Sequence, residues 1–62
     1  MEEAQVDTLT RDLGAEFGEI VDNETLRAVV EARAHRYDEA VVQDFVPLFV
    51  EREVRQALKR IA

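Results

Sequence analysis

Cysteine and serine are both absent from this chain of 62 residues, and histidine occurs once. Without cysteine the chain forms no disulfide and no thiolate metal site, which suits a reducing cytoplasm. Nucleophilic catalysis needs a hydroxyl, thiol or amine held beside a base. The candidates that remain would share one histidine, and they are Thr8, Thr10, Thr25 and Lys59. The composition therefore predicts a cytoplasmic protein that is not an enzyme and binds no cofactor.

Long apolar runs are lacking as well, because the longest contain three residues and charged residues make up 35% of the chain. We therefore expect no membrane-spanning segment, no membrane partner and no signal peptide. A chain of this length forms one domain, and a single core below about 70–80 residues supplies only roughly 3–5 kcal/mol. Small proteins usually add disulfides, a metal or self-association. This chain has no cysteine and cannot form a disulfide.

Positive charge is scarce in the first part of the chain, and the net charge is −6. Residues 1–24 contain eight acids and one base, Arg11, whereas the remaining residues contain six acids and seven bases. An acidic surface repels a phosphate backbone, so nucleic acid is not expected as a partner. The asymmetry predicts instead that an acidic first helix lies beside more basic later ones.

Apolar residues recur at spacings of three and four, the period of an amphipathic helix, over residues 3–17 and 23–36. The residues predicted to face inward are Val6, Leu9, Leu13, Phe17 and Ile20, then Leu26, Val29, Val30, Ala34 and Tyr37. Gly18 suits the left-handed residue that ends a helix, and Asp22 suits the cap that begins the next. We therefore predict a turn at residues 18–22.

A third helix is predicted over residues 41–60, which makes the fold class all-α and the architecture a three-helix bundle. Pro47 lies inside this range, where proline removes a backbone donor and clashes with the preceding turn. Either the helix begins late with Asp44 as its cap, or it begins at Val41 and bends at Pro47. The helical spacing of the apolar residues on both sides of the proline favours the bend.

Two lines of side chains run along this third helix. One stays apolar and is expected to face the core, and it comprises Val46, Val50, Val54, Ala57, Leu58 and Ile61. The other is apolar in its first half and charged in its second, and it comprises Val41, Phe45, Leu48, Arg52, Arg55 and Lys59. A helix that faces one core needs only one apolar stripe.

The second line therefore predicts contact with another chain, unless both lines are internal near Pro47. The partner is expected to be a second copy, forming a homodimer, or a different protein. The residues predicted to form this interface are Val41, Val42, Phe45, Leu48, Phe49 and Arg52.

Arg33 falls in the middle of the apolar side of the second predicted helix. Either its aliphatic stem covers the core while the guanidinium reaches water, or it forms an ion pair across the bundle or the dimer. We favour the first interpretation, since a long side chain can cover apolar surface while its charge stays hydrated.

Other charged residues are interpreted as solvated helix surfaces. His35 lies four residues from both Glu31 and Glu39, but a zinc site usually takes more than one His or Cys. Carboxylates alone would hold Mg²⁺ or Ca²⁺ weakly, and the candidates are Asp12, Glu16 and Glu19. A basic group that could bind phosphate or nucleic acid comprises Arg27, Arg33 and Arg36 with Tyr37. The helix that follows opens with Phe and Val, whereas a DNA-recognition helix would present polar residues that read the bases. We predict no metal site and no nucleic-acid site.

One segment of the chain resembles a small three-helix-bundle dimerisation domain that is common in actinobacteria. The segment is Val42-Gln43-Asp44-Phe45-Val46-Pro47-Leu48-Phe49-Val50-Glu51-Arg52-Glu53, preceded by Leu26-x-x-Val29-Val30 and Arg36-Tyr37. The resemblance covers nearly the whole chain and implies a three-helix fold and homodimerisation, without a catalytic motif. Such domains also precede arsenate-reductase-like low-molecular-weight phosphatases, which implies an accessory or regulatory domain as the alternative. This chain lacks the phosphatase loop and its cysteine.

Overall fold

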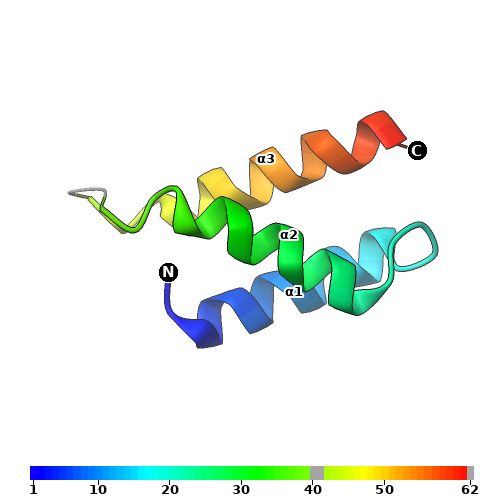
Figure 1. Ribbon diagram of the computed structural model, residues 1–62, viewed down its shortest axis with the longest axis horizontal. Helices are drawn as coiled ribbons and strands as arrows, with labels where there is room; N and C mark the ends of the chain where they lie inside the picture. The colour runs from blue at the N-terminus through cyan, green and yellow to red at the C-terminus, as the bar shows by residue number, and fades with distance from the viewer. Residues whose placement is uncertain (40–41, 62) are drawn as a thin grey trace.

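The computed structural model describes residues 1–39 and 42–61 and contains α1 (Glu3–Phe17), α2 (Asn23–His35) and α3 (Val46–Ile61). The helices pack against one another, with α1 and α3 running in the same direction and α2 in the opposite one (Figure 1). The predicted all-α class and the three packed helices are confirmed. Helix α2 packs more extensively on α1 and on α3 than these two pack on each other.

Helix α1 follows the predicted pattern. Its buried apolar residues lie three or four positions apart, and they are Val6, Leu9, Leu13 and Phe17. The backbone after α1 differs from the prediction, because Gly18 has φ −63° and ψ −19° and is therefore right-handed. Ile20 was also predicted to face inward, but it is 46% exposed. It lies in the turn after Phe17, where the helical period no longer sets the direction of the side chain.

Helix α2 begins with the predicted cap. The Asp22 Oδ1 atom accepts a hydrogen bond from the backbone N–H of Thr25 at 2.7 Å. This hydrogen bond lowers the pKa of the Asp22 carboxyl below its ordinary value. The buried residues of α2 are Leu26, Val30 and Ala34, and the partly buried Val29 and Tyr37 pack against the same core.

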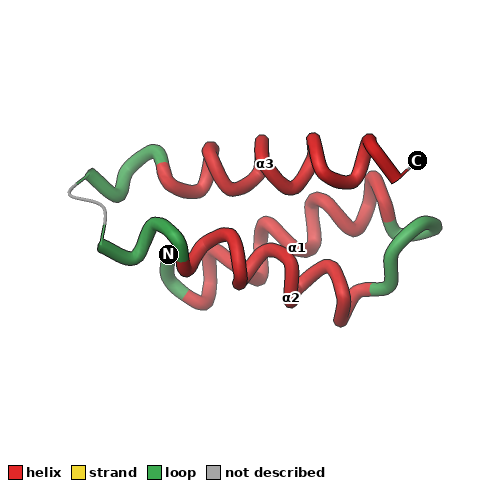
Figure 2. Tube along the Cα trace, turned by 45° about the horizontal axis from the view of Figure 1, so that its top comes forward, coloured by secondary structure: helices red, strands yellow, loops and turns green. Residues whose placement is uncertain are grey.

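Helix α3 begins at Val46, so the predicted start at residue 41 with a bend at Pro47 is wrong. Pro47 occupies the first turn, where a backbone N–H has no intrahelical acceptor and its loss therefore costs little. The first helical hydrogen bond runs from the Phe49 N–H to the Phe45 carbonyl at 3.1 Å. The described residues between the helices lie at the two ends of the molecule, residues 18–22 at one end and residues 36–39 and 42–45 at the other (Figure 2). Residue 41 itself lies outside the described residues, but residues 42–45 are described and are not helical.

The core line of α3 takes every fourth residue, and it comprises Val46, Val50, Val54 and Leu58. Ala57 and Ile61 were predicted to share this line, but Ala57 is only partly buried and Ile61 is 69% exposed. The C-terminal end of α3 diverges from α2 (Figures 1 and 2), which leaves its last residue uncovered. The side of α3 away from this line is free of the core.

Ion pairs join the acidic first helix to the later helices, as the charge asymmetry predicted. Arg27 of α2 pairs with Asp7 of α1 and also lies 3.7 Å from a Glu3 oxygen. Arg55 of α3 donates to the Glu16 carboxylate of α1 at 2.9 Å. Exposed pairs of this kind stabilise a fold by about 0.2–1 kcal/mol each, so the apolar core remains the main source of stability.

Candidate association surface

Four large apolar side chains lie in solvent at the start of α3. Val42 and Phe45 are each 59% exposed, Leu48 is 57% exposed and Phe49 is 43% exposed. We call these four residues the apolar surface. Two of the chain's three phenylalanines belong to it, whereas the third, Phe17, lies in the core.

Helix geometry brings these residues together. Because the Phe45 carbonyl accepts the first hydrogen bond of α3, Phe45 already follows the helical register. Residues three, four and seven positions apart share one helix face, and this face contains Phe45, Leu48, Phe49 and Arg52. Arg52 is exposed as well. The structure thus places four members of the predicted interface on one side of α3, whereas Val42 is exposed in the segment before the helix and Val41 lies outside the described residues.

A polar cluster fixes the border of the apolar surface toward α2. The Phe49 ring stacks on the Tyr37 ring, with centroids 6.1 Å apart and an interplanar angle of 30°. The Tyr37 hydroxyl donates to a Glu53 carboxylate oxygen, and the other oxygen lies 3.3 Å from Arg33 Nη1. These hydrogen bonds hold Tyr37, which in turn holds one edge of Phe49.

Arg33 therefore forms an ion pair across the bundle, which was the less favoured of the two sequence-based interpretations. Its side chain is 32% exposed and that of Glu53 is 27% exposed. Arg33 holds one oxygen of the Glu53 carboxylate in place, so that the other oxygen can accept a charge-assisted hydrogen bond from Tyr37. The hydrogen bond to Glu53 raises the pKa of the Tyr37 phenol above its ordinary value.

A groove between α1 and α3 borders the apolar surface on the other side. Its volume is about 500 Å³, and it is lined by Ala4, Gln5, Thr8, Leu9, Asp12, Asp44, Pro47, Leu48 and Glu51. A second groove of about 480 Å³ runs along α3, and it is lined by Leu48, Glu51, Arg52, Arg55, Gln56 and Lys59. Leu48 and Glu51 line both grooves. Leu48 thus projects between an acidic groove and a basic groove.

The charged residues of the two grooves differ in whether they have a partner. Arg55 lies 2.9 Å from a Glu16 oxygen and 3.2 Å from a Glu51 oxygen. Asp44, Arg52 and Lys59 have no ion pair among residues 1–39 and 42–61. Their charges therefore remain available to another molecule.

The residues considered for metal binding have other contacts. His35 Nδ1 lies 2.6 Å from an Asp38 oxygen. Glu31 contacts Arg27 at 3.0 Å, and Glu16 contacts Arg55. Within the described part of the chain, no three potential metal ligands gather at one point. The spacing of His35 from Glu31 and Glu39 is therefore that of neighbours on a helix and turn.

The residues considered for catalysis are dispersed. The Thr8 hydroxyl donates to the Ala4 carbonyl, whereas the Thr10 hydroxyl is buried without a hydrogen-bond partner among the described residues. Thr25 lies in the first turn of α2, and Lys59 lies in the last turn of α3. His35 is exposed near the end of α2, at the opposite end of that helix from Thr25.

Sequence reasoning missed the polar cluster and both grooves. Tyr37 follows Arg33 by four residues, and Glu53 follows Phe49 by four, so the spacing of each pair was visible. The contact between the two pairs depends on how α2 packs on α3. The grooves likewise depend on the separation of α1 and α3, for which the sequence carries no direct signal.

No protein-family model matches this chain, and no curated protein or solved structure is significantly similar to it. The resemblance to the actinobacterial dimerisation domain therefore stays a prediction. None of the three helices, in the part of the chain that the structure describes, combines the length and the apolarity needed to cross a membrane.

Proposed function

We propose that this protein is an association module that forms a homodimer through the apolar surface and Arg52. The observation that carries the proposal is the exposure of Phe45, Leu48 and Phe49 on one side of α3 and of Val42 in the segment just before it. Large apolar side chains gathered on one surface mark sites that another chain covers. Exposed apolar side chains beside open grooves suit a protein partner better than an enclosed small-molecule site does.

The energetics favour burial of this surface. Covering one large apolar side chain stabilises by about 1.5–3 kcal/mol, and roughly half of that remains available for each half-exposed residue. A symmetric dimer buries every such residue twice, so the gross gain is on the order of 10 kcal/mol before the entropy of association is subtracted. A core of this size supplies only roughly 3–5 kcal/mol of net stability. Dimerisation would therefore stabilise each folded copy by the part of this gain that exceeds the association cost of about 4–15 kcal/mol.

Sedimentation equilibrium of the chain over a concentration series tests the proposal. We expect dimers at micromolar concentration. In the Phe45→Asp variant each copy loses an exposed ring from the interface and gains a charge that would have to be buried without a partner. The dissociation constant should rise by about 100-fold or more, because the dimer contains the substitution twice.

Ile20→Asp is the matched control. Ile20 is 46% exposed, close to the 59% of Phe45, but it lies in the turn between α1 and α2. This control should dimerise like the unaltered chain. A chain that remains monomeric at tens of micromolar would refute homodimerisation and would direct the search to a different protein that binds the same surface. A Phe45→Asp variant that dimerises normally would show that the interface lies elsewhere.

A further inference from the structure

Leu48 separates two sets of opposite charges that have no ion pair within the described residues. Asp44 shares one groove with Leu48, and Arg52 and Lys59 share the other. Asp44 and Arg52 lie four residues before and four residues after Leu48. Arg52 lies about 6 Å along α3 from Leu48, whereas Asp44 lies in the turn that precedes α3, so the acid and the base lie on opposite sides of Leu48 along the chain.

This arrangement is self-complementary under a twofold rotation. A twofold axis through Leu48 would exchange the acidic and the basic sides, which brings Asp44 of one copy to Arg52 of the other. The same operation places the two Leu48 side chains together at the centre. Phe45 and Phe49, which share the face of α3 with Leu48, would be buried beside them.

We propose that the partner on the apolar surface is a second copy docked antiparallel, with the two α3 helices crossing near Leu48 and Arg52 of each copy facing Asp44 of the other. This orientation rests on the homodimer proposed above. It accounts for two charges, Asp44 and Arg52, that have no ion pair within the described part of the chain.

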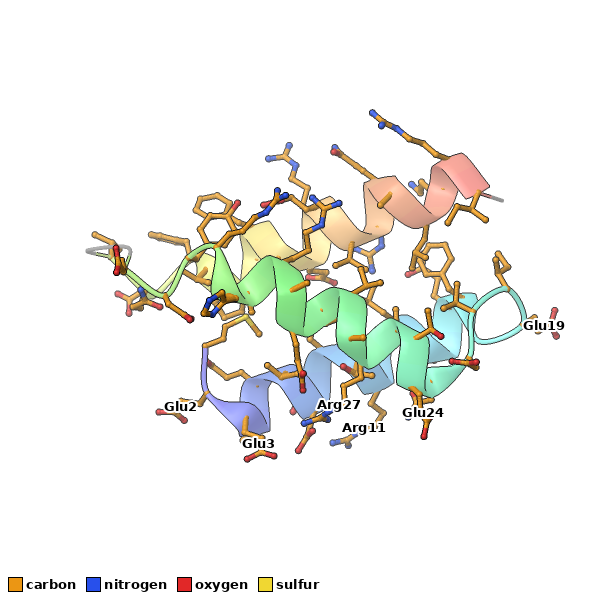
Figure 3. All side chains as sticks on the ribbon, viewed as in Figure 1. Glu2, Glu3, Arg11, Glu19, Glu24 and Arg27 are labelled. Atoms are coloured by element: carbon orange, nitrogen blue, oxygen red, sulfur yellow. The ribbon has the colours of Figure 1, made fainter. Side chains whose placement is uncertain are left out.

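The charge distribution disfavours a parallel dimer. In a parallel pair, Arg52 would lie beside Arg52 and Lys59 beside Lys59, and like charges placed together oppose association. In the antiparallel pair, the basic half of each α3 extends past the start of the other α3. Glu2 lies at that end of the molecule (Figure 3), and Glu39 and Asp44 belong to the chain segments there. The basic half therefore meets more acids than bases, although Arg36 also lies in these segments.

Exchange of the two charges tests the proposal. Asp44→Arg alone and Arg52→Asp alone each place like charges together twice in the dimer, and each should weaken it by about tenfold. The double variant restores opposite charges across the interface and should recover the affinity to within about threefold. Glu19→Arg is the control, because it changes the net charge as Asp44→Arg does but lies in the turn at the far end (Figure 3).

Single cysteines provide a geometric test, since the chain has none of its own. Under oxidation, an equimolar mixture of the Asp44→Cys and Arg52→Cys variants should form a mixed disulfide. Lys59→Cys should not crosslink to itself, because residue 59 lies 11 positions from Leu48 and the two copies would be about 33 Å apart. A disulfide needs Cα atoms within about 7 Å.

The outcomes separate the orientation from the homodimer itself. A dimer in which Lys59→Cys crosslinks efficiently is parallel, which overturns the orientation and leaves the association function standing. A double charge variant that stays as weak as its single parents also overturns the orientation. An unaltered chain that never dimerises overturns both proposals.

Discussion

The two glycines of the chain should respond oppositely to alanine, although they lie only four residues apart. A Cβ atom at Gly14 would meet Asn23 Oδ1 at 3.6 Å and Leu26 Cδ2 at 3.8 Å, which are ordinary contacts. A Cβ atom at Gly18 would lie 2.5 Å from the carbonyl oxygen of Gly14, closer than two such atoms approach without a shift of the backbone. Glycine is therefore required at position 18 because a side chain would collide with the backbone of α1, and not because the residue is left-handed.

The magnitudes follow from these distances. Gly14 lies inside α1, where alanine is more favourable than glycine by about 0.8–1.0 kcal/mol, so Gly14→Ala should stabilise the fold by about 1 kcal/mol. Gly18→Ala gains up to about 1 kcal/mol from restricting the unfolded chain, but overpacking costs about 1–3 kcal/mol. The net loss should be about 1 kcal/mol. Since 1 kcal/mol shifts the melting temperature of a 60–100-residue domain by about 4–8 °C, the two variants should differ by about 10 °C.

Thermal unfolding followed by circular dichroism measures the difference. All chains must be compared at one concentration, because dimerisation makes the melting temperature concentration-dependent. Gly18→Asn distinguishes the two explanations for Gly18, because asparagine tolerates a left-handed conformation much better than alanine does. With steric crowding as the cause, asparagine should be at least as damaging as alanine. A Gly18→Asn variant that melts like the unaltered chain would refute the steric explanation.

Two further predictions concern single hydroxyl groups. Tyr37 is the only tyrosine, and its hydrogen bond to Glu53 raises its pKa. An ultraviolet absorbance titration should therefore show a phenol pKa above the ordinary value, and this pKa should be lower in the Glu53→Gln variant. Because the folded state holds this proton more tightly, the associated stability is present below the unfolded pKa and is lost as pH rises through the folded one, and an unshifted titration would contradict the hydrogen bond. Thr10→Val removes a buried hydroxyl that has no partner in the described structure, so it should raise the free energy of unfolding in urea by about 1 kcal/mol. A decrease would indicate that the hydroxyl has a partner after all.

The sequence predicted α1 and α2 well because their signals are local. The three-and-four spacing of Val6, Leu9 and Leu13 sets the face of α1 without reference to any other element. Asp22 caps α2 through a backbone N–H three residues away, which is also a local interaction.

The local sequence does not determine where α3 starts, because proline is compatible with two local structures. In the first turn of a helix its missing N–H costs little, and in the interior it produces a bend. The apolar residues before Pro47 kept a helical spacing, which favoured the bend. The structure instead starts α3 one residue before Pro47.

The candidate surface was predicted in its residues but not in its surroundings. The helical period predicts that Phe45, Leu48 and Arg52 share one face, and all three are exposed as expected. The Tyr37–Glu53–Arg33 cluster and the two grooves at Leu48 depend on how α1, α2 and α3 are placed relative to one another. These relationships arise from packing across the whole bundle.

The separation of the α3 core line from the apolar surface allows folding and partner choice to change independently. Val50 and Val54 are fully buried on one side, and Leu48 and Phe49 are exposed on the other. Substitutions on the outer side can therefore alter what the protein binds while the interior that maintains its shape is left intact. Such a helix gives both natural variation and protein design a surface on which new binding specificities can be built from an unchanged scaffold.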